Sequence, residues 1–560
     1  KVRYNGFWRR FNMEKNFPEI TGRKIAALVM CSCADSFLSE EPVGEFMPEQ
    51  VESEENIEGI VIGAYAVLDG YYASDAINSG CSNWQFGDVV SDDAYKGGGG
   101  TGDQNQIHLM EIFNANPTGI DFEARWAALY EGVKRCNQAI RLLSNSTVKN
   151  KEQRLAEMRF LRGHYYFNLK VIYNLIPWID ETVVDPNEYH TKSNMEFTSD
   201  QLWEKILGEF SAAYQVLPES QSDYGRPTKM AAKAYMAKVY LYQSKWKECL
   251  SACDEVIQSG KYTLYPDFRE VFLPENDNNS EIIFAVQLSI NDGASSNQNG
   301  SYGDRLLPPG GPYPTYGFLR PTQNLVNAYK TNENGLPYND GKDVAESDYV
   351  DVRLDHTLAR PNIPFMDVQV YDWTPREASV YGPYSPKKRL VSLNSTHYSP
   401  IWPYVNALNF YVIRYADLLL WRAEAAIETG DLETGRKYIN KIRERAKNTQ
   451  HVKLWDDQSQ DAANYKVEIY TEPFKSKNEA VQALRMERRL EMAHEGIRFF
   501  DLVRWGIADE VLNVYFEKEK TFRSHLQNAR FVKGKHEYFP IPQSVIDICG
   551  AEVMKQNPGY

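Results

Sequence analysis

Adjacent carboxylates at Asp92 and Asp93 are the first residues of this chain whose type could perform catalysis. Glycoside hydrolases use two carboxyl groups, one as a general acid and the other as a base or nucleophile. Those groups come from separate segments that face each other across the bond to be cleaved. Neighbouring side chains diverge along a chain, so we do not expect Asp92 and Asp93 to form such a pair.

Other short patterns with a catalytic association are incomplete. His494-Glu495 and His536-Glu537 lack the second histidine of a metalloprotease helix. The glycine-rich run at 97–102 is followed by neither a lysine nor a clear helix, so we expect a flexible loop there and no phosphate site. The sequence also contains no G-x-S-x-G motif, which carries the nucleophile of many hydrolases.

The cysteines outside the N-terminal region do not suggest a metal site. Cys249 and Cys253 are four residues apart on an expected helix, and no second Cys or His pair completes a zinc set. We interpret both of them, together with Cys81, Cys136 and Cys549, as small buried apolar residues. With the incomplete catalytic patterns, this predicts a protein that is not an enzyme and that holds no cofactor and no metal.

The stretch 480–506 has the densest mixture of charged and aromatic residues. Several charged residues fall at three- and four-residue steps, which brings side chains together on one helix face: Glu487, Arg488, Glu491 and Glu495. Gly496 is a typical helix C-cap, and we expect an aromatic turn at 499–502 after it. The mixture suggests charges held in a packed layer, each with a partner. A solvated charged helix is the alternative for this stretch taken alone.

The same stretch resembles the C-terminal signature of the RagB/SusD family, whose members are surface lipoproteins that capture nutrients for an outer-membrane transporter. The matching positions are Glu487, Arg488, Glu491, Glu495, Gly496, Arg498, Asp501, Leu502, Arg504, Trp505 and Gly506. Three more segments resemble the family in its own order, at 160–180, 413–431 and 538–560. The resemblance implies a mostly α, SusD-like fold over one domain, residues 33–560, with an N-terminal part at about 33–260 and a C-terminal part at about 265–560.

The N-terminal region has the order of a secretory leader. Arg23 and Lys24 precede an apolar run that ends at Ser32, and Cys33 follows. The resemblance implies cleavage before a lipidated cysteine, which makes 1–32 the leader and Cys33 the lipid anchor. Cys31 is the alternative anchor, and Met13 is the expected initiator. No run of 18 or more apolar residues follows, so we expect no membrane-spanning helix.

Helical periodicity predicts four helix pairs, around 56–143, 152–217, 228–259 and 410–446, with an irregular segment at 79–118. In the last two pairs a small residue recurs twelve positions later across a turn, from Ala237 to Cys249 and from Ala423 to Gly435. That arrangement is typical of tetratricopeptide helix pairs, whose small residues let two backbones approach closely. Such pairs cover one another's apolar faces, so we expect them to stack into a right-handed superhelix.

The long segment 265–408 is rich in Pro, Gly, Asn and Tyr, and we interpret it as an ordered, loop-rich insert with short strands at 281–288 and 368–371. The resemblance implies a shallow ligand site built from this insert and from the loops after the first helix. The residues there that could form an arc of aromatics with nearby polar groups are Asn83, Trp84, Asp93, Tyr95, Tyr302, Tyr313, Tyr316 and Trp373. Aromatic faces suit sugar rings, and polar groups suit their hydroxyls.

The expected function follows from the resemblance. It implies a surface-exposed lipoprotein of the outer membrane that binds an oligosaccharide or polysaccharide and delivers it to a SusC-like TonB-dependent transporter. The alternatives are a tetratricopeptide-type scaffold with a protein partner and a SusD-like binder of peptides or glycoproteins. Nucleic acid is not an expected partner, because the chain has a net charge of −14 and no cluster of Lys and Arg.

Overall fold

The computed structural model describes residues 54–70, 80–310, 313, 315–367 and 374–560. The expected leader with Cys31 and Cys33, the predicted strand at 368–371 and the candidate residue Trp373 lie outside these ranges. Within the described ranges, helices dominate and strands are short, as expected for a mostly α chain.

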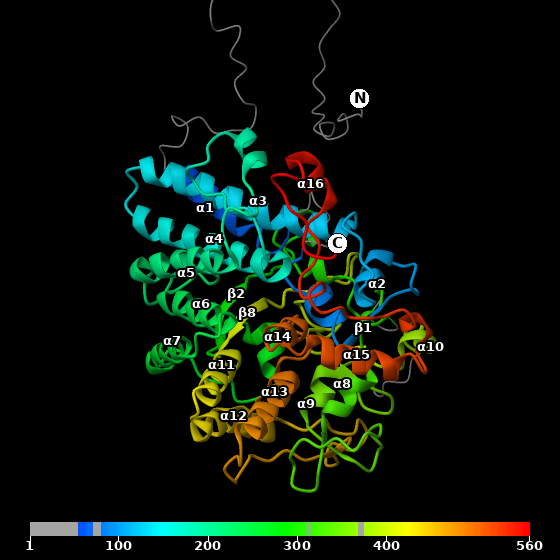
Figure 1. Cartoon of the computed structure of the whole chain (residues 1–560). Helices are drawn as coiled ribbons and strands as arrows, with labels where there is room; N and C mark the ends of the chain where they lie inside the picture. The colour runs from blue at the N-terminus through cyan, green and yellow to red at the C-terminus, as the bar shows by residue number, and fades with distance from the viewer. Residues whose placement is uncertain (1–53, 71–79, 311–312, 314, 368–373) are drawn as a thin grey trace, which may run out of the picture. The chain divides into compact units, whose positions relative to one another are not determined.

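Long helices pack against one another and form what we call the helical stack (Figure 1). It consists of α1 (Glu54–Tyr65), α3 (Ile120–Asn145), α4 (Lys151–Tyr173), α5 (Ser199–Val216), α6 (Lys229–Tyr242), α7 (Trp246–Gln258), α11 (Tyr415–Glu428), α12 (Leu432–Lys447) and α13 (Lys477–Met492). Helices α4 to α7 follow one another in chain order, and α7 contacts α11 although the insert separates them in sequence. The four predicted helix pairs are therefore confirmed as packed helices. The handedness of a superhelix stays a prediction.

Small residues set the spacing within the pairs. Ala237 and Cys249 are both fully buried where α6 meets α7. In the last pair, a Cβ added at Gly435 would come within 2.9 Å of Ile427 Cδ1 and closer still to Cγ1. Because Ile427 is itself fully buried, α11 and α12 can approach this closely only with glycine at position 435.

Polar side chains cap several of the stack helices. The Thr198 hydroxyl accepts a hydrogen bond from the Gln201 amide, and the Gln201 side chain accepts one from the Thr198 amide, so α5 begins with a complete capping box. Asp431 and Ser476 side chains cap α12 and α13 in the simpler way. These caps explain why α5, α12 and α13 begin directly after Thr198, Asp431 and Ser476.

The insert is joined to the stack by strands. Strand β2 (Ile282–Val286) pairs antiparallel with β8 (Phe410–Arg414), which leads directly into α11. The strand predicted at 281–288 is thus confirmed, whereas the helix predicted from 410 begins only after this strand. The insert's remaining elements are β3 (Phe318–Pro321), α8 (Gln323–Ala328), β4 (Lys330–Thr331), β5 (Tyr349–Val350), α9 (Arg353–Thr357), β6 (Leu358–Ala359), α10 (Ala378–Tyr381) and β7 (Ser385–Pro386).

The segment 79–118, predicted to be irregular, contains regular elements. They are a π-helix, η4 (Trp84–Val89), strand β1 (Ala94–Gly97), and α2 (Asn105–Glu111). Strand β1 pairs antiparallel with β3 of the insert. Its hydrogen-bond partner is distant in the sequence, so the local pattern of residues did not indicate a strand here. The glycine run after β1 was expected to be a flexible loop. Its first part is packed, because a Cβ on Gly98 would lie 2.5 Å from the Phe318 ring, whereas a Cβ on Gly100 or Gly102 would meet nothing within 4 Å.

The C-terminal part adds α14 (Arg498–Arg504), α15 (Ala508–Glu519) and α16 (Gln543–Cys549), and a short strand β9 (Asn464–Tyr465) joins β5. Two sequence interpretations are wrong here. Residues 499–502 form part of helix α14 and not a turn. Gly496 is not the cap of α13, which ends at Met492. Its φ is +75°, and a Cβ added there would lie 3.0 Å from Asn83 Cβ.

Glu487, Arg488 and Glu491 of α13 are buried, as predicted for a packed layer, but they pair with other segments and not with each other. Arg353 Nη1 lies 2.7 Å from Glu487 Oε1 and 3.0 Å from Glu491 Oε2. Arg414 Nη1 lies 2.6 Å from Glu491 Oε1, and Arg445 also contacts that carboxylate. Burial alone would raise the pKa of Glu491, but these arginines hold that pKa far below the usual carboxyl value.

The cysteines differ in how far they are buried. Cys136, Cys249 and Cys253 are buried as expected, whereas Cys81 and Cys549 are partly exposed, so the interpretation of the cysteines as buried residues holds for only part of the set.

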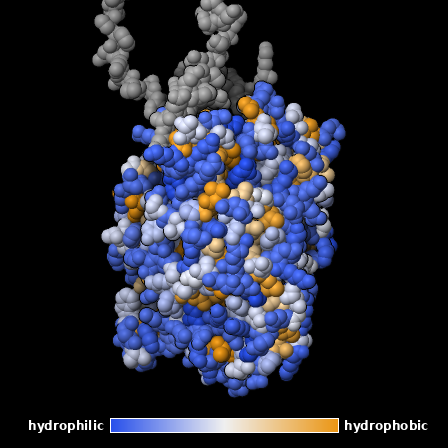
Figure 2. All heavy atoms as spheres, turned by 90° about the vertical axis from the view of Figure 1, so that its left-hand side faces the viewer, coloured by the Kyte–Doolittle hydropathy of each residue, from blue (hydrophilic) through white to orange (hydrophobic). Residues whose placement is uncertain are grey.

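On the side that Figure 2 shows, apolar groups form small orange areas scattered among hydrophilic ones, which is ordinary for a solvated protein surface. Within the described ranges, the helices are all too short or too polar to cross a membrane.

Candidate functional site

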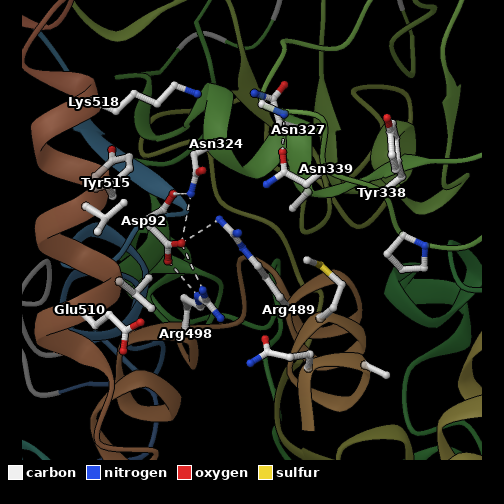
Figure 3. Close-up of a pocket in the computed structure, with 18 of the residues that line it drawn as sticks. Asp92, Asn324, Asn327, Tyr338, Asn339, Arg489, Arg498, Glu510, Tyr515 and Lys518 are labelled. Atoms are coloured by element: carbon white, nitrogen blue, oxygen red, sulfur yellow. Dashed lines mark hydrogen bonds and ion pairs between the residues drawn. The ribbon is translucent and has the colours of Figure 1, made fainter. Parts of the chain in front are cut away.

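Asp92 and Asp93 follow η4 and lie in a buried set of ion pairs with two arginines of the C-terminal part. Figure 3 shows Asp92 with both arginines. Arg498 Nε lies 2.8 Å from Asp92 Oδ1, and Arg489 Nε donates to Asp93 Oδ1 at 2.7 Å. Burial raises the pKa of Asp92, but Arg489 and Arg498 outweigh burial and keep that pKa below the usual value. Both carboxylates are therefore committed to holding α13 and α14 against the segment after η4.

Trp84 and Asn83, two predicted ligand residues, lie at the start of η4. The Trp84 side chain is only 3% exposed, and its ring meets Phe318 edge-on with 6.1 Å between centroids. Asn83 is partly exposed, and its Oδ1 accepts a hydrogen bond from Arg125. Trp84 thus presents no free face to solvent and packs in the apolar cluster that contains Phe318.

Tyr95 and Tyr313 are also buried in this structure. The Tyr95 hydroxyl donates to Glu519, and the Tyr313 hydroxyl donates to Asp367 Oδ2 at 2.8 Å. Trp84, Asp93, Tyr95 and Tyr313 are thus all buried, so these four residues do not form an exposed arc with the other predicted aromatics. Direct ligand contact by these four residues stays a prediction.

Tyr302 and Tyr316 are the predicted aromatics that reach the surface. The Arg305 guanidinium carbon lies 3.9 Å above the Tyr302 ring centroid, a stacked cation–π arrangement. Tyr316 packs on the apolar cluster that contains Trp84 and Phe318. Its hydroxyl accepts a hydrogen bond from Trp402 Nε1 at 3.2 Å.

Trp402 is a candidate that the sequence interpretation missed. The Trp402 side chain is 54% exposed and neighbouring Ile401 is 73% exposed, which is unusual for side chains of this size. The available signal was the apolar run Ile401-Trp402-Pro403-Tyr404-Val405 within a polar, loop-rich insert. We call Tyr302, Tyr316, Ile401, Trp402 and Tyr404 the aromatic shelf.

Backbone hydrogen bonds connect the two loops that carry most of the shelf. The Ser301 amide donates to the Asn406 carbonyl at 2.9 Å, and the Asn406 amide donates to Ser301 Oγ at 3.0 Å. This pairing places Tyr302 beside the loop that carries Trp402 and Tyr404. The shelf is therefore built on fixed loops, which lowers the entropy cost of binding a ligand there.

Behind the shelf is a cavity of about 40 Å³ lined by Trp84, Arg305, Tyr404, Asn406 and other residues. Ligand pockets are typically several hundred cubic ångströms in volume, so this cavity is too small for a sugar ring. A ligand at this place would have to lie on the surface of the shelf. Apolar rings beside polar Arg305 and the Tyr hydroxyls can stack on a ligand and bond its hydroxyls, without a group placed to break a bond.

Among the described residues, no three or more His, Cys, Asp or Glu side chains come together in a way that could hold a metal ion. Two buried carboxylates near the shelf form ion pairs. Arg389 Nη1 contacts Asp304, and Lys388 Nζ lies 2.5 Å from Glu495 Oε1. Both of these carboxylates line the 40 Å³ cavity. A third carboxylate in its lining, Asp88, accepts a hydrogen bond from the Gly496 amide at 2.9 Å, and burial raises its pKa well above the usual value.

Comparison with known proteins gives matches over both halves of the chain. A model described as "SusD family" matches residues 280–560, and one described as "Starch-binding associating with outer membrane" matches residues 36–241. A SusD-like protein P25 of Formosa agariphila is 24% identical over 92% of this chain and 94% of its own length. A SusD-like protein of Bacteroides ovatus is 23% identical over 95% of this chain and 93% of its own.

Solved structures share the fold. The surface glycan-binding protein A of Bacteroides fluxus is 25% identical and superposes with a TM-score of 0.69 over 91% of this chain and 100% of that one. A laminarin-binding SusD-like protein is 23% identical, with a TM-score of 0.68 and the same coverage. The surface glycan-binding protein A of Bacteroides thetaiotaomicron, solved with laminarihexaose, is 23% identical with a TM-score of 0.67 over 90% of this chain and 99% of that one.

Proposed function

This chain belongs to the SusD family, and on that premise we propose that it binds a neutral glycan at the aromatic shelf and delivers it to a SusC-like TonB-dependent transporter in the outer membrane. The observation that carries the proposal is the exposed Trp402 ring, hydrogen-bonded to Tyr316 in the loop-rich insert. We propose binding without catalysis, because Asp92 and Asp93 are both held in ion pairs.

The chemistry of the shelf fits a sugar. A pyranose ring has apolar C–H faces and a rim of hydroxyls, so it suits a flat aromatic next to hydrogen-bonding groups. Trp402 and Tyr316 supply aromatic faces, while Arg305 and the tyrosine hydroxyls supply polar partners. Of the sequence-based candidates, we propose that Tyr302, Tyr316, Trp373 and Asn83 contact ligand, and that Trp84, Asp93, Tyr95 and Tyr313 support them from behind.

The matched proteins point to the ligand class. Two of the superposed structures are named for laminarin binding or were solved with laminarihexaose, and one family model is described as starch-binding. Laminarin and starch are both neutral glucose polymers, so a neutral glucan is the first ligand class to test. A shallow site also suits a polymer, because repeated weak contacts along it raise the overall avidity.

The proposed location is the outer-membrane surface, with the chain held by lipid at Cys33. The description of the N-terminal family model, which names association with the outer membrane, supports this part of the proposal. The transporter would receive the glycan from the shelf. The alternatives are a tetratricopeptide-type scaffold and a binder of peptides or glycoproteins. Each of these would bind a protein, a peptide or a glycoprotein in place of a free glycan.

The test is affinity electrophoresis and isothermal titration calorimetry with the leaderless chain and a panel of neutral and acidic glycans. We expect retention by at least one neutral glucan. Trp402→Ala should weaken that binding at least about tenfold, because it removes the most exposed aromatic face of the shelf.

The matched control is Trp455→Ala, which removes a tryptophan that is 46% exposed outside the shelf. This variant should bind as the unmodified chain does. If no glycan is retained, or if Trp402→Ala and Trp455→Ala behave alike, the shelf is not a carbohydrate site. Co-purification of a partner other than a barrel transporter would then favour the scaffold alternative.

A further inference from the structure

A cleft of about 720 Å³ lies away from the shelf residues, between α8, α13, α15 and the loop at 337–341 (Figure 3). None of the aromatic-shelf residues lines it. Its volume falls within the range of small-molecule sites, which is about 300–1,000 Å³. The cleft is therefore large enough for part of an oligosaccharide, unlike the cavity behind the shelf.

The charged groups at the floor of the cleft are bound to one another. Asp92 is held by Arg498 and also lies 3.0 Å from Arg489 Nη2, as the dashed lines of Figure 3 show. Asn324 Nδ2 donates to Asp92 Oδ2 at 3.1 Å. A floor whose charged groups already hold one another needs little rearrangement when a ligand arrives.

One wall is the loop that carries Tyr338. The Tyr338 amide donates to the Lys330 carbonyl at 2.9 Å, and Arg443 Nη2 donates to the Gly335 carbonyl at 2.8 Å. The Tyr338 side chain is nevertheless 47% exposed and lines the cleft. The loop thus presents an aromatic group from a fixed backbone.

Four carboxamide side chains line the cleft: Asn324, Asn327, Asn339 and Gln482. A carboxamide both donates and accepts hydrogen bonds, as a sugar hydroxyl does. In the part of the chain that the structure describes, the side chains of Gln482, Glu510 and Lys518 form no hydrogen bond or ion pair, although all three line the cleft. Figure 3 shows Glu510 and Lys518 on α15, on the opposite side of the view from Tyr338.

The charges that line the cleft cancel. Three cationic side chains, Arg489, Arg498 and Lys518, are balanced by three anionic ones, Asp92, Glu479 and Glu510. A site for a phosphorylated, sulfated or uronic-acid ligand would carry an excess of cations. Balanced charge, carboxamides and an exposed tyrosine instead match an uncharged, hydroxyl-rich ligand.

We propose that this cleft is a second binding site for a neutral oligosaccharide, separate from the aromatic shelf. The inference rests on the proposed function, because it takes the same ligand class. Two sites on one chain would hold a polymer at two points, which raises avidity without a tighter single contact.

The test is calorimetry of the leaderless chain with neutral hexasaccharides, beginning with laminarihexaose. The unmodified chain should bind two molecules of the hexasaccharide that it recognises. The double variant Tyr338→Ala with Gln482→Ala should bind one, and Trp402→Ala should retain binding at the cleft. Tyr338→Phe keeps the aromatic face and should weaken cleft binding less than about tenfold.

The outcomes separate the two proposals. One bound molecule that Trp402→Ala abolishes and the double cleft variant leaves unchanged would overturn the cleft site while the shelf stands. One bound molecule lost only in the double variant would support the cleft and overturn the shelf. If the double variant binds every hexasaccharide normally but no longer co-purifies with the transporter, the cleft is a protein contact and this inference is wrong. Thermal unfolding monitored by circular dichroism confirms that each variant is folded.

Discussion

At the scale of single residues, buried charge is the dominant feature of this protein. Glu491 is fully buried and receives arginines from three different segments, at positions 353, 414 and 445. An isolated buried carboxylate would be costly, so each of these pairs depends on the others. Since the arginines lower the pKa of Glu491, its contribution to stability is present above the usual carboxyl pKa and is lost as the pH falls below it.

Glu491→Gln should destabilise the protein strongly. The amide cannot neutralise the arginines that meet there, and breaking a buried ion pair typically costs about 3–5 kcal/mol. Urea or guanidinium unfolding, monitored by circular dichroism, measures the change. Glu444→Gln is the control, because Glu444 lies on the exposed face of α12, and we expect its effect to stay within about 0.5 kcal/mol. Equal unfolding midpoints for the two variants would contradict a cooperative network.

At the scale of elements, close backbone approaches decide how helices meet. A Cβ on Gly87 in η4 would lie 3.0 Å from Gly496 Cα and closer still to the Gly496 carbonyl. The π-helix can therefore pack against the connection between α13 and α14 only because both positions are glycine. The same principle acts within the stack, where Gly435 lets α12 approach α11.

Gly435→Ala should destabilise the protein relative to Gly208→Ala. Both substitutions place alanine within a helix and gain similar helix propensity, so their difference isolates the contact with Ile427. Added bulk in a packed core typically costs about 1–3 kcal/mol, whereas a Cβ at Gly208 would meet nothing within 4 Å. Thermal or denaturant unfolding of both variants measures this difference. If Gly435→Ala is as stable as Gly208→Ala, the spacing of α11 and α12 is not limited at this position.

At the scale of the whole molecule, a stack of helices carries an insert whose loops form the shelf. Strands β2 and β8 fix where the insert leaves and rejoins the stack, and β1 with β3 ties it to the segment after η4. The ligand-facing loops are therefore anchored at several points. We propose that a lipid at Cys33 holds this body at the membrane.

Cys33→Ser should move most of the protein from the membrane pellet to the supernatant when full-length chain is expressed in a bacterium that processes lipoproteins. The reason is that acyl chains on this cysteine would be its only strong attachment to the membrane. Cys31→Ser is the matched control and should remain in the pellet. Release of the Cys31 variant with retention of the Cys33 variant would identify Cys31 as the anchor instead.

The sequence by itself determined the helix pairs, the need for small residues between them and the requirement that the charges of α13 have partners. These features depend on local periodicity and side-chain size, which a single sequence displays directly. It did not reveal that Arg353, Arg414 and Arg445 converge on Glu491, that Trp84 and Tyr95 are buried, or that Trp402 is exposed. Those outcomes depend on which distant segments pack together, and an aromatic residue has the same local sequence signal whether its ring faces the core or the solvent.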